Sequence, residues 1–177
     1  SSDGAARDMA RETTGWSASN VDVDQVNCTY YDSWGRDDSA YLLARAVQFF
    51  TPGIPQVYYV GLLAGHNDMD LLARSGVGRD INRHSYTRDE IDRDLARPVV
   101  VALLALIRFR NGHPAFEGQC EVGGDGSHVT LTWTVGEGEQ SASLDADLET
   151  GRATLTWTGP HGEANTCQDL LRLRHGY

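Results

Sequence analysis

The chain has 177 residues, of which 40% are hydrophobic and 23% charged, as is typical of a soluble globular protein with one large or two small domains. Its formal net charge of −10 argues against a nucleic-acid-binding protein, because such binding depends on clustered positive charge. The longest apolar run, from Pro98 to Ile107, is about half of the roughly 18 residues that a membrane-spanning helix needs, so no membrane span is expected.

The cysteine pattern predicts a reducing setting. Cys28, Cys120 and Cys167 are too few and too scattered for a disulfide framework, and none forms the Cys-x-x-Cys pair of a zinc site. The first residues, 1–4, lack the basic and apolar regions of a signal peptide. We therefore expect a cytoplasmic protein without a bound metal.

The first regular elements are expected after a polar surface stretch over residues 1–19. A helix is predicted from Asp37 to Phe50, because an aspartate can cap its start and the following apolar residues recur at helical spacing. The run 54–61 is almost entirely apolar or aromatic, which predicts a strand that is buried on both faces. A helix followed by such a strand is the repeating unit of an α/β fold.

A long polar segment follows, from Leu62 to Glu90, and loops of that length within a domain are usually functional. Within it, the run 78–84 (Gly-Arg-Asp-Ile-Asn-Arg-His) carries five side chains that form hydrogen bonds. A helix is then predicted from Ile91 to about Arg110, with Pro98 as the first residue of a second helical piece.

The last part of the chain, residues 113–177, predicts a small antiparallel β domain. Residues 129–135 and 153–158 alternate with period two, and Gly-rich turns separate them. Both runs contain Thr-Leu-Thr-Trp-Thr. Either the segments are a tandem repeat or two strands of a meander share one packing constraint, and the meander is the favoured interpretation.

Four segments of the chain, taken together, resemble the sucrose phosphorylases, which belong to the α-amylase superfamily of retaining glycosidases (glycoside hydrolase family 13). These segments are residues 20–31, 48–61, 63–69 and 78–84. The resemblance extends over about residues 20–115 without an obvious gap, whereas the β domain matches only in position and strand pattern.

The resemblance implies an α/β fold, namely the C-terminal part of a (β/α)₈ TIM barrel followed by the antiparallel β domain. A complete barrel needs about 250 residues, which exceeds this chain. Residues 1–36 would form an excursion after the seventh barrel strand. Residues 37–112 would form the last barrel units: the seventh helix, the eighth strand, a long loop and the eighth helix. Residues 113–177 would be the C-terminal domain.

The resemblance also implies a reaction. In the parent enzyme, sucrose would form a covalent glucosyl-enzyme and release fructose, and phosphate would then yield α-glucose 1-phosphate. The nucleophilic Asp, the acid/base Glu and a stabilising Asp are all expected upstream of Ser1, so no catalytic residue is assigned in this chain. No cofactor or metal is implied. The expected partners are the missing N-terminal part of the barrel and, for the parent, a second copy in a homodimer.

Arg79 matches an arginine that helps to bind the glucosyl unit, and its fork of donors suits sugar hydroxyls. The alternative is a structural salt bridge with Asp80 or Asp68. Asp80, Arg83 and His84 are predicted to brace the loop that carries Arg79.

Val21, Asp22 and Gln25 match a loop that contacts the fructosyl or acceptor side of the substrate, although a solvated loop with a capping carboxylate is the alternative. Asp24 stands where the family usually has a tyrosine that is linked to phosphate binding. A carboxylate beside an incoming phosphate is unfavourable, so water, another sugar or a polyol could be the better acceptor.

Two further hypotheses remain from the sequence. One is an enzyme of the same superfamily with another acceptor, such as a sucrose hydrolase or a glucosyltransferase. The other is an inactive fragment or split half that needs a partner chain.

Overall fold

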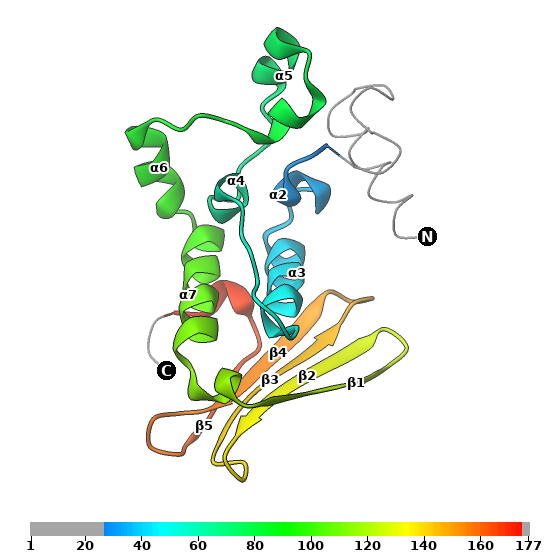
Figure 1. Ribbon diagram of the computed structural model, residues 1–177, viewed down its shortest axis with the longest axis vertical. Coiled ribbons are helices and arrows are strands. Elements are labelled where there is room, and N and C mark those ends of the chain that lie inside the picture. Colours follow the sequence, from blue (N-terminus) through cyan, green and yellow to red (C-terminus); the bar gives the residue numbers. More distant parts are fainter. Residues whose placement is uncertain (1–26, 175–177) are drawn as a thin grey trace. The chain divides into compact units, whose positions relative to one another are not determined.

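A computed structural model describes residues 27–174, and the chain divides into two compact units. Within the described part, the first unit comprises residues 27–37 and 57–100, and the second comprises residues 38–56 and 101–174. The elements of both units are labelled in Figure 1.

The second unit is built on a five-stranded antiparallel sheet whose spatial order follows the chain order (Figure 1). The strands are β1 (Gln119–Asp125), β2 (His128–Val135), β3 (Gln140–Asp147), β4 (Arg152–Thr158) and β5 (Ala164–Cys167). The predicted antiparallel β domain is therefore confirmed, and the strand order is that of a meander.

The register explains why β2 and β4 share a sequence motif. Trp133 of β2 and Trp157 of β4 are both paired with Ala142 of the central strand β3. Two residues along, Leu131 and Leu155 flank Leu144 in the same way, and all three leucines are buried. Because side chains alternate across a sheet, these positions share one face, which is the packed one. The repeated motif thus marks two strands under the same packing constraint.

Helix α3 (Asp38–Phe50) supplies large buried side chains to the core of the second unit, including Tyr41, Phe49 and Phe50. The indole Nε1 of Trp133 donates a hydrogen bond of 2.7 Å to the carbonyl of Phe50, which joins the end of the helix to β2. This helix ends at Phe50 as the sequence predicted and begins one residue later than the predicted Asp37.

The second predicted helix is present in two pieces, α6 (Arg88–Leu95) and α7 (Pro98–Gly112). Pro98 is the first residue of α7, a position where its missing N–H costs no hydrogen bond. Thr87 and Glu90 form a capping box at the start of α6. The predicted interruption at Pro98 is confirmed.

The predicted strand over 54–61 is wrong as an assignment of secondary structure. Residues 54–58 have no regular structure and no ladder partner among the described residues, and α4 (Tyr59–Leu62) forms a single helical turn. Ile54 is 92% exposed and Tyr58 50% exposed, although burial on both faces was expected. A buried parallel strand exists only between neighbouring strands, and residues 27–174 supply none on either side.

The polar segment of the first unit holds more regular structure than its sequence indicated. It contains α5 (Met69–Ser75) and the 3₁₀ helix η2 (Gly78–Asn82), and α2 (Tyr30–Ser33) precedes it in the chain. The second unit contains the 3₁₀ turns η3 (Pro114–Glu117) and η4 (Leu170–Arg172). Within residues 27–174, no helix combines the length and apolar character that crossing a membrane requires.

Candidate functional site

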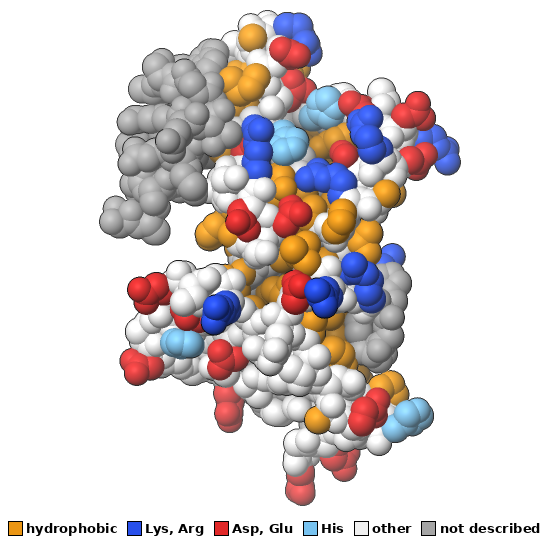
Figure 2. Space-filling view, turned by 180° about the vertical axis from the view of Figure 1, so that it is seen from behind, with side chains coloured by type: hydrophobic (Ala, Val, Ile, Leu, Met, Phe, Trp, Pro, Cys, Tyr) orange, Lys and Arg blue, Asp and Glu red, His pale blue; other side chains and the backbone are white. Residues whose placement is uncertain are grey.

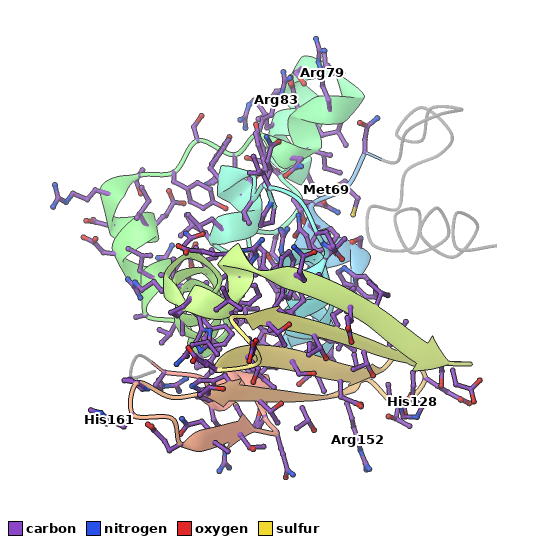
Figure 3. All side chains as sticks on the ribbon, turned by 60° about the horizontal axis from the view of Figure 1, so that its bottom comes forward. Met69, Arg79, Arg83, His128, Arg152 and His161 are labelled. Atoms are coloured by element: carbon purple, nitrogen blue, oxygen red, sulfur yellow. The ribbon has the colours of Figure 1, made fainter. Side chains whose placement is uncertain are left out.

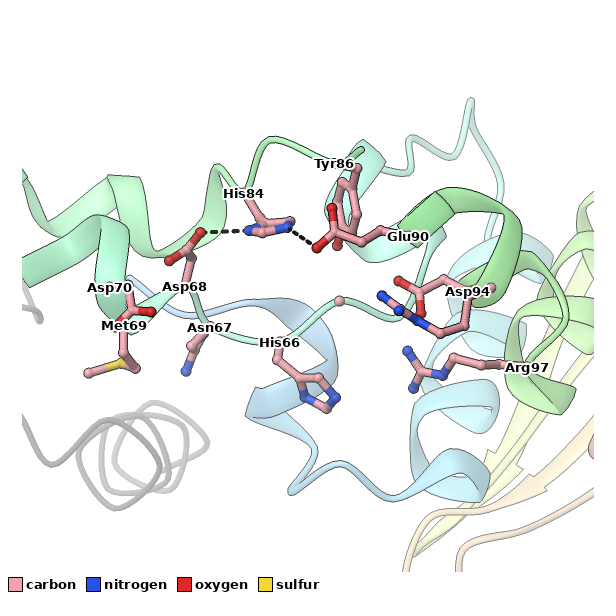
Figure 4. Close-up of a pocket in the computed structure, with 12 residues that line it drawn as sticks. His66, Asn67, Asp68, Met69, Asp70, His84, Tyr86, Glu90, Asp94 and Arg97 are labelled. Carbon is pink, nitrogen blue, oxygen red and sulfur yellow. Dashed lines mark hydrogen bonds and ion pairs between the residues drawn. The ribbon is translucent and has the colours of Figure 1, made fainter. Parts of the chain in front are cut away.

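The first unit contains a polar cavity of about 710 Å³ (Figure 4). It is lined by the loop before α5, the segment after η2 and one side of α6. The lining residues are Gly65, His66, Asn67, Asp68, Met69, Asp70, His84, Tyr86, Glu90, Arg93, Asp94 and Arg97. Figure 2 shows histidine, arginine and acidic side chains gathered on the surface of this unit.

Asp32 of α2 does not line the cavity itself but binds two residues that do, His66 and Asn67. Its side chain has no exposed surface, and both of its oxygens accept hydrogen bonds of 3.0 Å from the guanidinium of Arg36. It also accepts from the backbone N–H of Asn67 at 3.1 Å and lies 3.0 Å from Nδ1 of His66. Burial alone would raise the pKa of Asp32, but the hydrogen bonds from His66, Arg36 and Asn67 outweigh it and hold that pKa below its ordinary 3.8.

His66 is therefore fixed in orientation although its side chain is 49% exposed. Because ionised Asp32 accepts a hydrogen bond, the favoured neutral tautomer of His66 carries its proton on Nδ1 and a lone pair on Nε2. The neighbouring Asn67 is buried, and its side-chain oxygen accepts a 2.7 Å hydrogen bond from the N–H of Thr29. The loop before α5 is thus held to α2 at two consecutive residues.

His84 forms a second imidazole–carboxylate contact on the opposite wall, marked by dashed lines in Figure 4. Its Nδ1 lies 2.6 Å from Asp68, and its Nε2 lies 3.4 Å from Glu90. Asp68 also caps α5 by accepting from the N–H of Leu71 at 2.7 Å. The hydrogen bond to Asp68 raises the pKa of His84 above its ordinary 6.5, and the contact with Glu90 acts in the same direction. This imidazole links the start of α5 to α6.

Tyr86 completes this wall, and Tyr59, which is not a lining residue, contacts the backbone of His84. The hydroxyl of Tyr59 donates a 2.9 Å hydrogen bond to the carbonyl of His84, and the ring of Tyr86 lies edge-on to the imidazole. Burial, followed by the charge of Asp94, raises the pKa of Tyr86 to about 12, so its hydroxyl stays protonated. A side chain at Gly65 would collide with the Tyr86 hydroxyl, and the close approach therefore requires glycine there.

The balance of charge decides what the cavity can hold. Its wall carries four carboxylates, on Asp68, Asp70, Glu90 and Asp94, against the two guanidinium groups of Arg93 and Arg97. Carboxylates therefore outnumber guanidinium groups on this wall. A set of carboxylates, imidazoles, guanidinium groups and one aromatic ring suits a ligand rich in hydroxyl groups.

Among the described residues, Arg79, which was predicted to bind the glucosyl unit, does not line this cavity, whereas His84, which was predicted to brace the loop, does. Arg79 is exposed on η2, points outward in Figure 3, and has no hydrogen bond or ion pair with any residue in 27–174. Asp80 instead pairs with Arg83 at 3.3 Å, and Asp68 pairs with His84. The alternative of a salt bridge from Arg79 to Asp80 or Asp68 is therefore not what the structure contains.

The predicted acceptor-side residues lie outside the described part of the chain. They are Val21, Asp22 and Gln25, together with the departure from the family pattern at Asp24. Within residues 27–174, no group of three His, Cys, Asp or Glu side chains is arranged to hold a metal ion.

Sequence reasoning missed most of the cavity. His66, Asp68 and Glu90 come from separate parts of the segment 62–90, and only the fold brings them together. Two local signals were present. The run His66-Asn67-Asp68 is dense in polar groups, and Thr87-x-x-Glu90 is a capping-box pattern that places Glu90 in the first turn of a helix.

The relatives found by comparison with known proteins include phosphorylases of glucosyl compounds. No family model matches the chain. It is 56% identical over 152 residues to a sucrose phosphorylase of Agrobacterium vitis, a match that covers 85% of this chain and 31% of that protein. It is 49% identical over 131 residues to a glucosylglycerol phosphorylase of Marinobacter adhaerens, covering 73% and 27% respectively.

A solved structure agrees with these relatives. The crystal structure of sucrose 6F-phosphate phosphorylase from Thermoanaerobacter thermosaccharolyticum superimposes with a TM-score of 0.78 at 46% identity, over 81% of this chain and 29% of that one. The match confirms the predicted fold class. Fold and sequence together make the chain a homologue of part of the phosphorylases named above. More narrowly, it matches the C-terminal part of sucrose phosphorylases, as its motifs predicted, and spans about 31% of the relative from Agrobacterium vitis.

Proposed function

We propose that the chain is the C-terminal part of a sucrose phosphorylase-like retaining glucosyl transferase. The parent enzyme converts sucrose and phosphate into α-glucose 1-phosphate and fructose by double displacement. The observation that carries the proposal is the 56% identity to a sucrose phosphorylase across 85% of the chain. At that identity over 152 residues, a shared fold and a related chemistry are the simplest explanation.

In this proposal the chain contributes to substrate binding and not to bond cleavage. The two carboxyl groups of a retaining enzyme stand about 5–5.5 Å apart, and both belong to the N-terminal part of the barrel. Arg79 grips the glucosyl unit, and Val21, Asp22 and Gln25 contact the acceptor side. The Asp80–Arg83 pair supports this role for Arg79, because it leaves the Arg79 guanidinium without a partner among the described residues.

The proposed organisation of the parent follows the same match. Residues 1–36 form an excursion after the seventh barrel strand, residues 37–112 form the last barrel units, and residues 113–177 form the C-terminal domain. The chain then requires the N-terminal barrel as its partner. The parent acts in the cytoplasm and pairs with a second copy in a homodimer.

A second candidate is a phosphorylase or transferase of the same superfamily with another acceptor. Its specific support is the 49% identity to a glucosylglycerol phosphorylase, whose name indicates a glucosyl–glycerol bond. Asp24 separately supports a hydrolase or glucosyltransferase whose acceptor is not phosphate, since a carboxylate occupies the place of a tyrosine linked to phosphate binding. Replacing Asp24 by Tyr in the parent is expected to raise phosphorolysis relative to hydrolysis. An unchanged ratio would remove Asp24 from the argument.

Product analysis of the full-length parent tests the first proposal. With sucrose and phosphate, glucose 1-phosphate is the expected main product; with phosphate omitted, only slow release of glucose is expected. If free glucose predominates in both reactions, the enzyme is a hydrolase. If a glucosylated polyol is made or cleaved faster than sucrose, the second candidate is correct.

The role of Arg79 is tested by Arg79→Ala in the same parent. Loss of charged hydrogen bonds to the glucosyl unit is expected to lower kcat/KM for sucrose by about 10- to 150-fold. The matched control is Arg152→Ala, which removes an exposed arginine from β4 and should leave kcat/KM unchanged. Equal activity of the two variants would contradict a binding role for Arg79.

A further inference from the structure

His66 carries an orientation device that the proposed reaction does not use. The fully buried Asp32 holds Nδ1 of this imidazole at 3.0 Å, and Arg36 and the N–H of Asn67 hold the carboxylate in turn. The imidazole lines the cavity, and its Nε2 has no hydrogen-bond partner in residues 27–174. Burying a carboxylate to fix an exposed ring costs desolvation energy, and the same carboxylate–imidazole contact orients histidines that bind metal ions through their other nitrogen.

The cavity has the size and surface of a site for a small molecule. Its volume of about 710 Å³ falls within the range of roughly 300–1,000 Å³ that small-molecule sites occupy. Arg97 is held in place by donating hydrogen bonds of 3.1 and 3.0 Å to the carbonyls of Leu63 and Ala64. Tyr86 adds a half-buried aromatic ring to the same wall.

The charge of the wall favours a neutral polyhydroxy ligand over a phosphate. Four carboxylates face two guanidinium groups, so a phosphate would meet an excess of negative charge. A neutral polyhydroxy compound avoids this repulsion, because its hydroxyl groups donate to carboxylates and to Nε2 and accept from arginine. The aromatic ring can pack against its C–H groups.

We propose that this cavity binds a neutral sugar or polyol, with Nε2 of His66 accepting a hydrogen bond from a ligand hydroxyl and Asp32 acting as the positioning residue. The site would be new for this chain, since Arg79 is not among the residues that line it. The proposal does not rest on the phosphorylase reaction. Binding measurements alone decide whether the proposal is correct.

Isothermal titration of the 177-residue chain with fructose, glucose, glycerol and inorganic phosphate tests the proposal. At least one of the neutral compounds is expected to bind at one site, and phosphate is expected to bind more weakly or not at all. In His66→Asn, the amide nitrogen takes the place of Nδ1 and keeps the contact with Asp32, while the atom at Nε2 is lost. Its affinity is expected to fall about tenfold.

Two further variants serve as controls for this titration. His66→Gln places an amide near the position of Nε2 and is expected to retain more affinity than His66→Asn. His161→Asn alters an exposed histidine in the β4–β5 turn (labelled in Figure 3) and should bind as the unmodified chain does. Circular dichroism must show the same unfolding midpoint for all variants compared.

Three outcomes would overturn the proposal: no binding of any neutral compound, preferential binding of phosphate, or equal affinity in His66→Asn and the unmodified chain. A failure of the proposed phosphorylase activity is recognised separately, because it would appear as absent glucose 1-phosphate in the full-length parent while these titrations remained unchanged.

Discussion

Asp32 joins α2 to the loop before α5 through a carboxylate that has no exposed surface. Replacing it by Asn removes the charge that Arg36 and His66 face while keeping the shape of the side chain. Breaking a buried ion pair on one side costs about 3–5 kcal/mol, but Arg36 is half exposed and can be solvated. We therefore expect Asp32→Asn to lower the free energy of unfolding at pH 7 by about 2–4 kcal/mol, as measured with urea.

The effect of Asp32→Asn should depend on pH. The pKa of Asp32 in the folded chain lies below its ordinary 3.8, so its contribution is present above pH 3.8 and is lost as pH falls through the lowered value. The difference in free energy of unfolding between the unmodified chain and Asp32→Asn should therefore become smaller in acid. Asp92→Asn is the control, since its carboxylate is 66% exposed and 3.9 Å from Arg88, and it should change stability by less than about 0.5 kcal/mol.

His84 contributes with the opposite dependence on pH. Its pKa in the folded chain is raised above 6.5, so its ion pair with Asp68 stabilises fully below pH 6.5 and is lost as pH rises through the raised value. Asp68→Asn retains a good helix cap but removes the charge. We expect it to cost up to about 1 kcal/mol at pH 6 and little at pH 9.

An NMR titration of the His84 imidazole measures its pKa directly and tests whether Asp68 raises it. The midpoint should lie above 6.5 in the unmodified chain and fall in Asp68→Asn. In Asp70→Asn, an exposed carboxylate two residues away on the same helix is removed, and the midpoint should stay nearly unchanged. Equal midpoints in all three proteins would contradict the assignment of the shift to Asp68.

At the scale of elements, β2 and β4 offer a matched comparison. Trp133 donates to the carbonyl of Phe50, whereas the buried Nε1 of Trp157 has no partner among the described residues. Both side chains pack on the same face of the sheet beside Ala142. Replacing either by Phe removes similar apolar area, but only Trp133→Phe removes a strong donor from the Phe50 carbonyl, which then keeps the weak 3.9 Å contact from Sγ of Cys120.

Trp133→Phe is therefore expected to lower the free energy of unfolding by about 1–3 kcal/mol more than Trp157→Phe does. Urea unfolding of the two variants, followed by circular dichroism, gives the difference. If Trp157→Phe is the more destabilising of the two, the hydrogen bond to Phe50 does not govern this end of the sheet.

Elements whose pattern is local could be predicted from the sequence. The helix 38–50, the break at Pro98 and the alternating strands β2 and β4 depend on neighbouring residues and on caps, which the sequence displays. The strand over 54–61 was wrong because pairing requires other strands, and a run of apolar residues does not reveal whether they are present. The cavity was missed because His66, His84 and Glu90 are joined only by the fold.

At the scale of the whole molecule, the chain spans 31% or less of the relatives described above, and several of its apolar side chains face solvent. Ile54 is 92% exposed, Tyr58 50% and Tyr59 43%. In the proposed parent, barrel elements that this chain lacks would cover these side chains. Apolar side chains that are exposed on a segment expected to be buried indicate that this chain needs the N-terminal part of the barrel to cover them.

The isolated chain is accordingly expected to show no turnover on sucrose, with or without phosphate. Retaining cleavage needs a nucleophilic carboxylate and an acid about 5–5.5 Å apart, and the proposal assigns both to the N-terminal barrel. Glucose 1-phosphate should be assayed with the 177-residue chain alone, with a separately produced N-terminal part of the parent, and with the two combined. Activity in the mixture only would identify a split half, and absence of activity in all three would indicate a fragment that cannot reassemble. Release of glucose 1-phosphate by this chain alone would contradict the assignment of both catalytic carboxylates to the missing part.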